Sequence, residues 1–153
     1  RNGTFTEYYQ DGVTPRKETP ILQGKIDGTV KTYFRNGKIE AEKEYKQSVE
    51  SGRERRFDSK TGEQIFESHY IDGKKDGEEW EIFEDASTLR SRIIRHYRNG
   101  KLDGSYRVES TRDGKPYITI EGQYTDGEKS GQWIEHNYDN NTQTCTWHGE
   151  GGA

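Results

Sequence analysis

The feature that most constrains this chain is a glycine that returns at nearly equal intervals. It recurs every 24 to 27 residues along the 153-residue sequence, and each recurrence opens a segment similar to the others. A fixed period of this length is typical of tandem repeat proteins, in which each unit packs against its neighbours. The six opening glycines are Gly3, Gly28, Gly52, Gly77, Gly104 and Gly131. We therefore predict one repeat domain with units near residues 1–26, 27–50, 51–75, 76–102, 103–130 and 131–153.

The turn chemistry predicts that each unit is a β-hairpin. Ten of the 18 glycines follow Asn or Asp, the pairs preferred in two-residue type I′ turns, where both residues need positive φ. The expected turns within the units are Asp11-Gly12, Asn36-Gly37, Thr61-Gly62, Ala86-Ser87-Thr88, Asp113-Gly114 and Asn140-Asn141. The aromatic residues expected to close most units are Tyr45, Tyr70, Tyr97, Tyr124 and Trp147. We expect an all-β fold, an elongated and twisted antiparallel meander of about 11 or 12 strands, either extended or curled.

The second unit allows the strand register to be predicted. A two-residue turn at Asn36-Gly37 would place Phe34 opposite Ile39, Thr32 opposite Ala41 and Gly28 opposite Tyr45 on one face. The other face would pair Tyr33 with Glu40, and Lys31 with Glu42. In the fifth unit, Val108, Ile118 and Ile120 fit this scheme poorly, so we expect a bulge or a three-residue loop there. The best helix candidate, Asp85 to Ile94, lacks a C-terminal glycine and is flanked by strand-like segments, so we expect almost no helix.

Composition predicts a thin core. Apolar residues make up 26% of the chain, charged residues 34% and aromatic residues 12%, with a net charge of −4, so buried rings must replace many missing aliphatic side chains. No apolar run is long enough to span a bilayer, which argues against a membrane-integral protein. The single cysteine, Cys145, excludes an internal disulfide. The chain opens inside a repeat motif at Arg1, so we expect that upstream sequence was removed. Localisation stays open between the cytoplasm and the periplasm or cell envelope.

The repeat motif resembles a known bacterial family. The segments that carry the resemblance are Asp27-Gly28-Thr29-Val30-Lys31-Thr32-Tyr33-Phe34-Arg35-Asn36-Gly37-Lys38, Asp76-Gly77-Glu78-Glu79-Trp80 and Gly122-Gln123-Tyr124-Thr125-Asp126-Gly127-Glu128-Lys129-Ser130-Gly131-Gln132-Trp133. This pattern, found along nearly the whole chain, resembles the MORN-variant repeat of YwqK-like antitoxins. The resemblance implies an extended antiparallel meander and a role in neutralising a toxin partner. It is specific for architecture, because the motif consists of turn glycines and packing aromatics.

No residue pattern in the sequence indicates catalysis or a cofactor. The histidines are His69, His96, His136 and His148, and none has a recognised catalytic spacing to a Cys, Ser or carboxylate. Cys145 and His148 could supply two metal ligands, but a zinc site needs three or four. The many carboxylates are better explained by solvation, because a single-layer sheet offers no pocket that would separate the pKa values of a pair. We therefore expect a protein that is not an enzyme, without catalytic, cofactor or metal residues.

Two blocks of charge and several aromatic residues are the candidate contact residues. Acidic residues fill 78–85 and arginines fill 90–98, so one hairpin can form a salt-bridge ladder, with Glu84 near Arg90 and Glu79 near Arg95. The same blocks could instead form a bipolar patch that steers a charged protein partner. Adjacent rings must point to opposite faces of a strand, so some either serve as binding anchors or pack within a curled sheet. The predicted partner-binding residues are Tyr8, Tyr33, Trp80, Glu79, Glu81, Arg92, Arg95 and Trp133.

Two functions are therefore expected from the sequence. The first is a protein-binding module, of antitoxin or immunity type, that neutralises a toxin or effector. The alternative is a structural repeat associated with lipid or the cell envelope, against which the acidic net charge argues. A nucleic-acid partner is disfavoured by the sequence pI of about 5.7 and by acidic residues beside each basic cluster. An open meander also leaves two unpaired edges, so an edge-strand homodimer is expected as a further possibility.

Overall fold

The chain folds into antiparallel β-sheet. The computed structural model describes residues 1–84 and 90–149, and no described residue is helical. The strands follow one another in meander order in a single sheet that stays open and does not close into a barrel. Twelve strands lie on this path and two short strands lie off it. The predicted all-β meander is confirmed, whereas the predicted turn at Ala86-Ser87-Thr88 lies outside the described residues.

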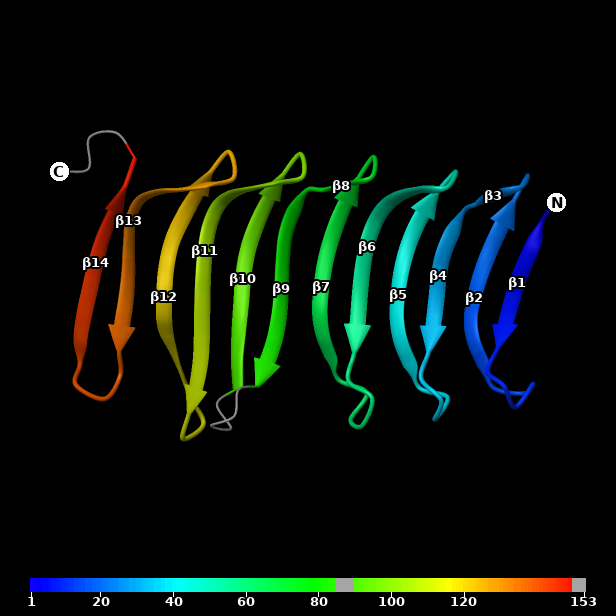
Figure 1. The fold of residues 1–153 in the computed structure, drawn as a ribbon, viewed down its shortest axis with the longest axis horizontal. Helices are drawn as coiled ribbons and strands as arrows, with labels where there is room; N and C mark the ends of the chain where they lie inside the picture. The colour runs from blue at the N-terminus through cyan, green and yellow to red at the C-terminus, as the bar shows by residue number, and fades with distance from the viewer. Residues whose placement is uncertain (85–89, 150–153) are drawn as a thin grey trace. The chain divides into compact units, whose positions relative to one another are not determined.

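The strands divide into two compact units, Arg1–Lys75 and Asp76–Ala153, which we call unit 1 and unit 2. Each of them contains several of the sequence repeats, and the word unit without a number refers below to one repeat. Within unit 1 and within unit 2, neighbouring strands lie side by side (Figure 1). Unit 1 contains β1 (Gly3–Tyr8), β2 (Pro15–Leu22), β3 (Lys25–Ile26), β4 (Gly28–Tyr33), β5 (Ile39–Lys46), β6 (Val49–Phe57), β7 (Gln64–Ile71) and β8 (Lys74–Lys75). Unit 2 contains β9 (Gly77–Glu84), β10 (Arg90–Arg98), β11 (Lys101–Arg112), β12 (Lys115–Thr125), β13 (Glu128–Asn137) and β14 (Thr142–His148). The residues rejected as a helix, from 90 to 94, belong to β10.

In unit 1 and in unit 2, one face of the sheet is more buried than the other. Five of the six opening glycines pair with the tyrosine or histidine that closes their unit: Gly28 with Tyr45, Gly52 with Tyr70, Gly77 with Tyr97, Gly104 with Tyr124 and Gly131 with His148. Gly3 pairs with Ile21. We call the face that carries these closing residues the tyrosine face. Within residues 1–84 and 90–149, the ten buried residues all lie on it: Thr19, Val30, Glu54, Phe66, Ser68, Glu79, Ser91, Val108, Ser110 and Trp133. The core is thus thin, as predicted, but Trp147 does not close the last unit: His148 does, and Trp147 is exposed.

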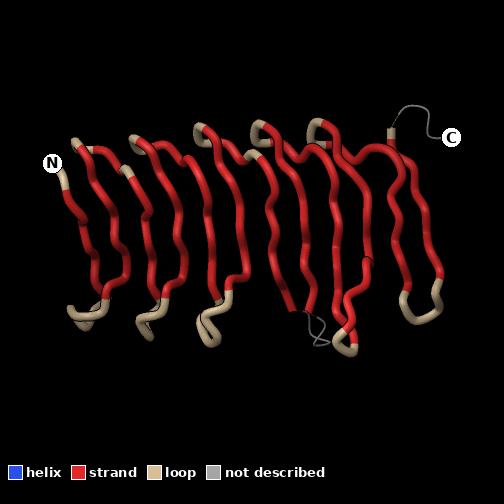
Figure 2. Tube along the Cα trace, turned by 180° about the vertical axis from the view of Figure 1, so that it is seen from behind, coloured by secondary structure: helices blue, strands red, loops and turns tan. Residues whose placement is uncertain are grey.

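The turns between repeats lie at one end of the strands, and the turns within repeats lie at the other end (Figure 2). The turns between units have positive φ at both central residues, as type I′ geometry requires. They are Gln23-Gly24, Gln47-Ser48, Asp72-Gly73, Asn99-Gly100 and Asp126-Gly127. Of the turns within units, Asp113-Gly114 also has this form, with φ of 51° and 75°. Of these six turns with positive φ at both central residues, four therefore consist of the Asn-Gly or Asp-Gly pairs that the sequence indicates.

The predicted two-residue turn at Asn36-Gly37 is wrong. Only Gly37 has positive φ, and the Phe34 N–H donates to the Lys38 carbonyl at 2.8 Å, so the loop contains three residues. The register shifts as a result, and Tyr33 pairs with Ile39. The predicted pairs Phe34 with Ile39 and Tyr33 with Glu40 are therefore wrong, whereas the pairs of Gly28, Lys31 and Thr32 are confirmed.

The Asn-Gly and Asp-Gly pairs that open the units are not turns. Their glycines have φ between 106° and 134°. Gly3, Gly28 and Gly77 begin strands, and Gly104 lies within β11. The preceding side chain accepts a hydrogen bond from the first backbone N–H of the type I′ turn that leads into the next unit. These bonds join Gln23 N to Asn2 (2.7 Å), Gln47 N to Asp27 (3.2 Å), Asn99 N to Asp76 (3.0 Å) and Asp126 N to Asp103 (3.1 Å). We call this contact the turn staple.

The fifth unit contains the expected irregularity. Val108 pairs with Ile120, and the next residue, Glu109, pairs with Ile118, so Thr119 is the extra residue of a bulge. The Thr119 hydroxyl donates to the Val108 carbonyl at 3.1 Å. The bulge is confirmed, while the turn itself keeps two residues.

Gly122 on β12 is required by packing. A Cβ atom there would lie 2.2 Å from Trp133 Cδ2, so the indole ring covers this glycine directly. We predict that Gly122→Ala lowers the free energy of unfolding by about 1–3 kcal/mol or more through overpacking, measured by urea denaturation. Gln123→Ala, on the next residue, keeps the backbone carbonyl that Trp133 uses and serves as the control. Equal stability of the two variants would contradict the packing of Trp133 on Gly122.

Candidate functional site

The tyrosine face of unit 2 contains a shallow cavity of about 330 Å³, which we call the aromatic hollow. Strands β11 to β14 supply its walls. Its lining residues are Tyr106, Ile120, Tyr124, Lys129, Trp133, Glu135, Thr144, Thr146 and His148. This volume lies at the lower end of the range for small-molecule sites, about 300–1,000 Å³, and suits one or two side chains of a partner.

Three rings form the floor of the aromatic hollow. The Tyr106 and Trp133 ring centres are 5.3 Å apart, and Tyr124 meets both rings edge-on, at 5.7 Å and 5.2 Å. Trp133 is held in place because its Nε1–H donates to the Gln123 carbonyl at 3.1 Å. The Lys129 ammonium lies 4.4 Å from the Trp133 ring, in cation–π range. The hollow is therefore a fixed aromatic surface with one cation at its rim.

The second residue after an opening glycine is buried in most units, and in two units it is a carboxylate. Val30 and Trp133 occupy this position with 8% and 6% exposure, and Glu54 and Glu79 occupy it with 5% and 0%. A buried charge is costly unless it is paired. Both glutamates are paired, as the next two paragraphs describe.

Glu79 forms the predicted salt-bridge ladder with the arginine strand. The Arg95 guanidinium bonds the Glu79 carboxylate and lies 3.2 Å from Glu81, and Arg90 lies 3.8 Å from Glu84. Burial works against the charge of Arg95, but its bond to Glu79 outweighs this and raises the Arg95 pKa. The predicted pairs of Glu79 with Arg95 and of Glu84 with Arg90 are confirmed. Because it is fully buried, Glu79 can act on a partner only through the side chains bonded to it, which include Arg95 and Tyr97.

Glu54 is at the centre of a cluster in unit 1. Its carboxylate accepts from Arg56 at 2.7 Å and from the Tyr70 hydroxyl at 3.1 Å, and Lys43 lies 3.5 Å away. Burial opposes ionisation, but Arg56, Lys43 and Tyr70 outweigh it and hold the Glu54 pKa below its ordinary value. Burial and the Glu54 charge raise the pKa of Tyr70 to about 12. Glu54 is thus a structural carboxylate that is ionised at neutral pH.

These contacts limit the chemistry of the titratable groups. A carboxylate whose pKa is lowered by a bound guanidinium is a poor general acid. Among residues 1–84 and 90–149, no three His, Cys, Asp or Glu side chains are placed to share a metal ion. Three histidines lie near glutamates of the sheet: His69 by Glu67 (3.7 Å), His96 by Glu78 (3.6 Å) and His136 by Glu121 (3.9 Å). His148 instead meets the Trp133 ring at 6.4 Å.

The structure does not bring all predicted partner-binding residues together. Glu79, Glu81, Arg95 and Trp133 lie on the tyrosine face of unit 2, and Trp133 is mostly covered as the floor of the aromatic hollow. Trp80 and Arg92 lie on the opposite face of the same hairpin, with the guanidinium 4.5 Å from the indole ring. Tyr33 belongs to unit 1, where burial and a hydrogen bond with Glu18 raise its pKa to about 12. Tyr8 is half exposed on β1.

Sequence reasoning named Trp133 alone among the nine lining residues of the hollow and missed the other eight, including Tyr106, Tyr124, Lys129 and His148. The signal that could have found them is their place in the repeat. Tyr106 and Trp133 are both the second residue after an opening glycine, and Tyr124 closes the unit between them. Aligning the units by this position would have gathered the three rings.

Replacing Glu54 should change how stability depends on pH. We predict that Glu54→Gln lowers the free energy of unfolding at pH 7 by about 1–3 kcal/mol, because Arg56 and Lys43 lose their acceptor. A carboxyl with a lowered folded-state pKa stabilises fully above its ordinary value of 4.5 and loses this effect as the pH falls through the lowered value. The difference between variant and parent should therefore shrink below about pH 4.5 in urea titrations. Glu128→Gln, at an exposed site, is the control; a difference independent of pH would contradict the pairing.

Comparison with known proteins adds no relative. No helix that could cross a membrane occurs among the described residues. No family model, curated protein or solved structure matches the chain.

Proposed function

We propose that this chain is a non-catalytic protein-binding repeat module of the antitoxin or immunity type. The observation that carries the proposal is the aromatic hollow, where three fixed rings and Lys129 form an open surface on a sheet. Tyr and Trp side chains in fixed positions are frequent energetic centres of protein interfaces. The shallow shape favours an inserted side chain of a protein over an enclosed substrate. The resemblance of the repeat to YwqK-like antitoxins points to a toxin or effector as the partner.

The proposal is tested with the proteins encoded by the genes that flank the gene of this chain. We expect the purified chain to retain one of them and to protect cells against its toxicity. Lys129→Glu reverses the charge at the hollow and should weaken the affinity by about tenfold or more, a loss of about 1.4 kcal/mol. Lys115→Glu makes the same charge change at the Asp113-Gly114 turn and should leave the affinity unchanged. If no flanking product binds, or if both variants bind like the parent, the proposal is wrong.

A second candidate function rests on one edge of unit 1. Three exposed apolar residues at its type I′ turns, Leu22, Val49 and Ile71, are 49%, 44% and 58% exposed. Each pairs directly with a lysine: Leu22 with Lys25, Val49 with Lys46 and Ile71 with Lys74. Apolar side chains beside lysines suit the surface of an anionic bilayer. This edge supports the lipid-associated alternative.

Sedimentation with phosphatidylserine-containing vesicles tests the lipid alternative. The chain should co-sediment at low salt and be released as salt screens the lysines. Ile71→Glu should lower the bound fraction, whereas Val13→Glu, at an exposed loop of the same unit, should not. Absence of co-sedimentation at low salt would exclude this function.

A further inference from the structure

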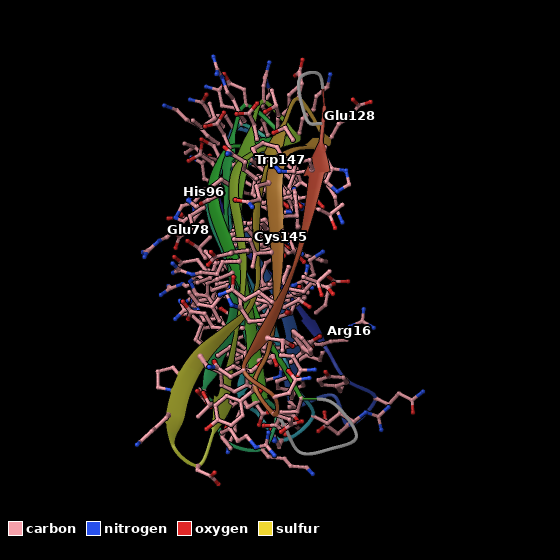
Figure 3. All side chains as sticks on the ribbon, turned by 90° about the vertical axis from the view of Figure 1, so that its left-hand side faces the viewer. Arg16, Glu78, His96, Glu128, Cys145 and Trp147 are labelled. Carbon is pink, nitrogen blue, oxygen red and sulfur yellow. The ribbon has the colours of Figure 1, made fainter. Side chains whose placement is uncertain are left out.

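The face of unit 2 opposite the tyrosine face carries one row of side chains that crosses all six strands. Successive strands place these residues directly opposite one another: Trp80 with Ile94, Ile94 with Arg107, Arg107 with Glu121, Glu121 with Ile134 and Ile134 with Cys145. We call these six residues the central row. Figure 3 looks across the strands, and two other residues of this face, Glu78 and His96, are labelled on one side of the sheet.

The central row is symmetric in polarity and opposite in charge about its centre. Its two middle positions are the cation Arg107 and the anion Glu121, and each is followed outward by an isoleucine. A twofold axis parallel to the strands, midway between β11 and β12, would therefore bring unlike charges and like apolar side chains together in two stacked molecules. The contacts would be Arg107 on Glu121, Ile94 on Ile134 and Trp80 on Cys145.

We propose that a second copy of this chain packs on this face and forms a twofold dimer. Such a contact is isologous, because each molecule contributes the same surface and the contact closes on itself. The aromatic hollow lies on the other face of the sheet and stays open in this dimer. The inference therefore does not depend on the proposed function.

The charges at the centre of the row are available to a second molecule. The His136 imidazole Nε2 lies 3.9 Å from the Glu121 carboxylate, and within residues 1–84 and 90–149 no lysine or arginine forms an ion pair with Glu121. Arg107 Nε lies 2.9 Å from the Glu109 carboxylate, which leaves further N–H donors of the guanidinium. Arg107 of the second molecule would supply the permanent cation that Glu121 lacks. Charge pairs of this kind determine the partner and the register of an interface.

The apolar part of the face has the extent that a stable dimer needs. Trp80, Ile94 and Ile134 are partly exposed, and Ile82 and Ile118 lie one row away on the same face. Six strands about 4.8 Å apart, over about eight residues of about 3.3 Å each, give a face of about 750 Å². A standard interface buries about 800 Å² per partner. Two sheets that stack face to face lie about 10 Å apart, with their side chains interdigitated between them.

Charge reversal at the two central positions tests the proposed axis. Light scattering should give twice 17.8 kDa for the parent chain. Arg107→Glu would set carboxylates against each other in both halves of the contact, and Glu121→Arg would set guanidinium groups against each other. Each variant alone should therefore have a dissociation constant at least tenfold higher than the parent. In a mixture of the two variants every contact again joins unlike charges, so the mixture should return to the mass of a dimer.

The control is Lys115→Glu, which reverses a charge on the tyrosine face at the Asp113-Gly114 turn and should dimerise like the parent. The proposal would be overturned by a parent chain that stays monomeric at every concentration tested. Variants that dimerise as well as the parent would overturn it too, and so would a mixture in which the dimer is not recovered.

The reactivity of Cys145 provides a test that needs no charge variant. Cys145 is exposed in the single chain, and Trp80 of the second molecule would cover it. Its reaction with the thiol reagent DTNB should slow at least tenfold as the protein concentration rises through the range in which light scattering detects the dimer. The control combines Thr142→Cys with Cys145→Ser, which moves the thiol to the tyrosine face of β14, where the rate should not change. A dimer in which Cys145 reacts at an unchanged rate would pack through another surface and overturn the proposal.

Discussion

The fold depends on the contact between each opening glycine and the residue that closes its unit. The glycine has a positive φ that other residues rarely adopt, and it lies directly opposite a tyrosine or histidine in five units. The turn staple adds a second contact at the same end of the strands, because the residue before the glycine holds the turn into the next unit. The two contacts occur together at Gly28, Gly77 and Gly104, where they fix the register of the hairpin. The register determines which side chains share the tyrosine face. The aromatic hollow and the Glu54 cluster are consequences of that register.

A single-layer sheet buries few positions, so the chemistry of those positions distinguishes the units. The second residue after the opening glycine is aliphatic in one unit, indole in another and carboxylate in two. A buried ion pair contributes little net stability, but removal of one partner is costly because the other charge stays buried. Glu54 and Glu79 therefore give their units contacts that an apolar residue could not make. In unit 2 the rings of Tyr106 and Trp133 at the same position produce the aromatic hollow instead.

The sequence predicted the architecture well because glycine spacing and strand alternation are local signals. The Gly28–Tyr45 pair, the Glu79–Arg95 pair and the bulge near Val108 followed from them. The errors arose where two local structures share one signal. Asn36-Gly37 fits both a two-residue turn and a three-residue loop. An Asp-Gly pair can form a turn, and it can also open a repeat, where the Asp side chain forms the turn staple. The burial of Glu79 and the grouping of Tyr106 with Trp133 depend on which face of neighbouring strands they share, which the pattern of one strand does not reveal.

Amide hydrogen exchange tests the turn staple most directly. Asn99, Asp113 and Asp126 are each the first residue of a type I′ turn in unit 2. The amides of Asn99 and Asp126 donate to Asp76 and Asp103, whereas no acceptor for the Asp113 amide is present among the described residues. The account predicts that Asn99 and Asp126 exchange much more slowly than Asp113. Equal exchange at the three amides would show that the staple does not hold the turns, and would contradict the account.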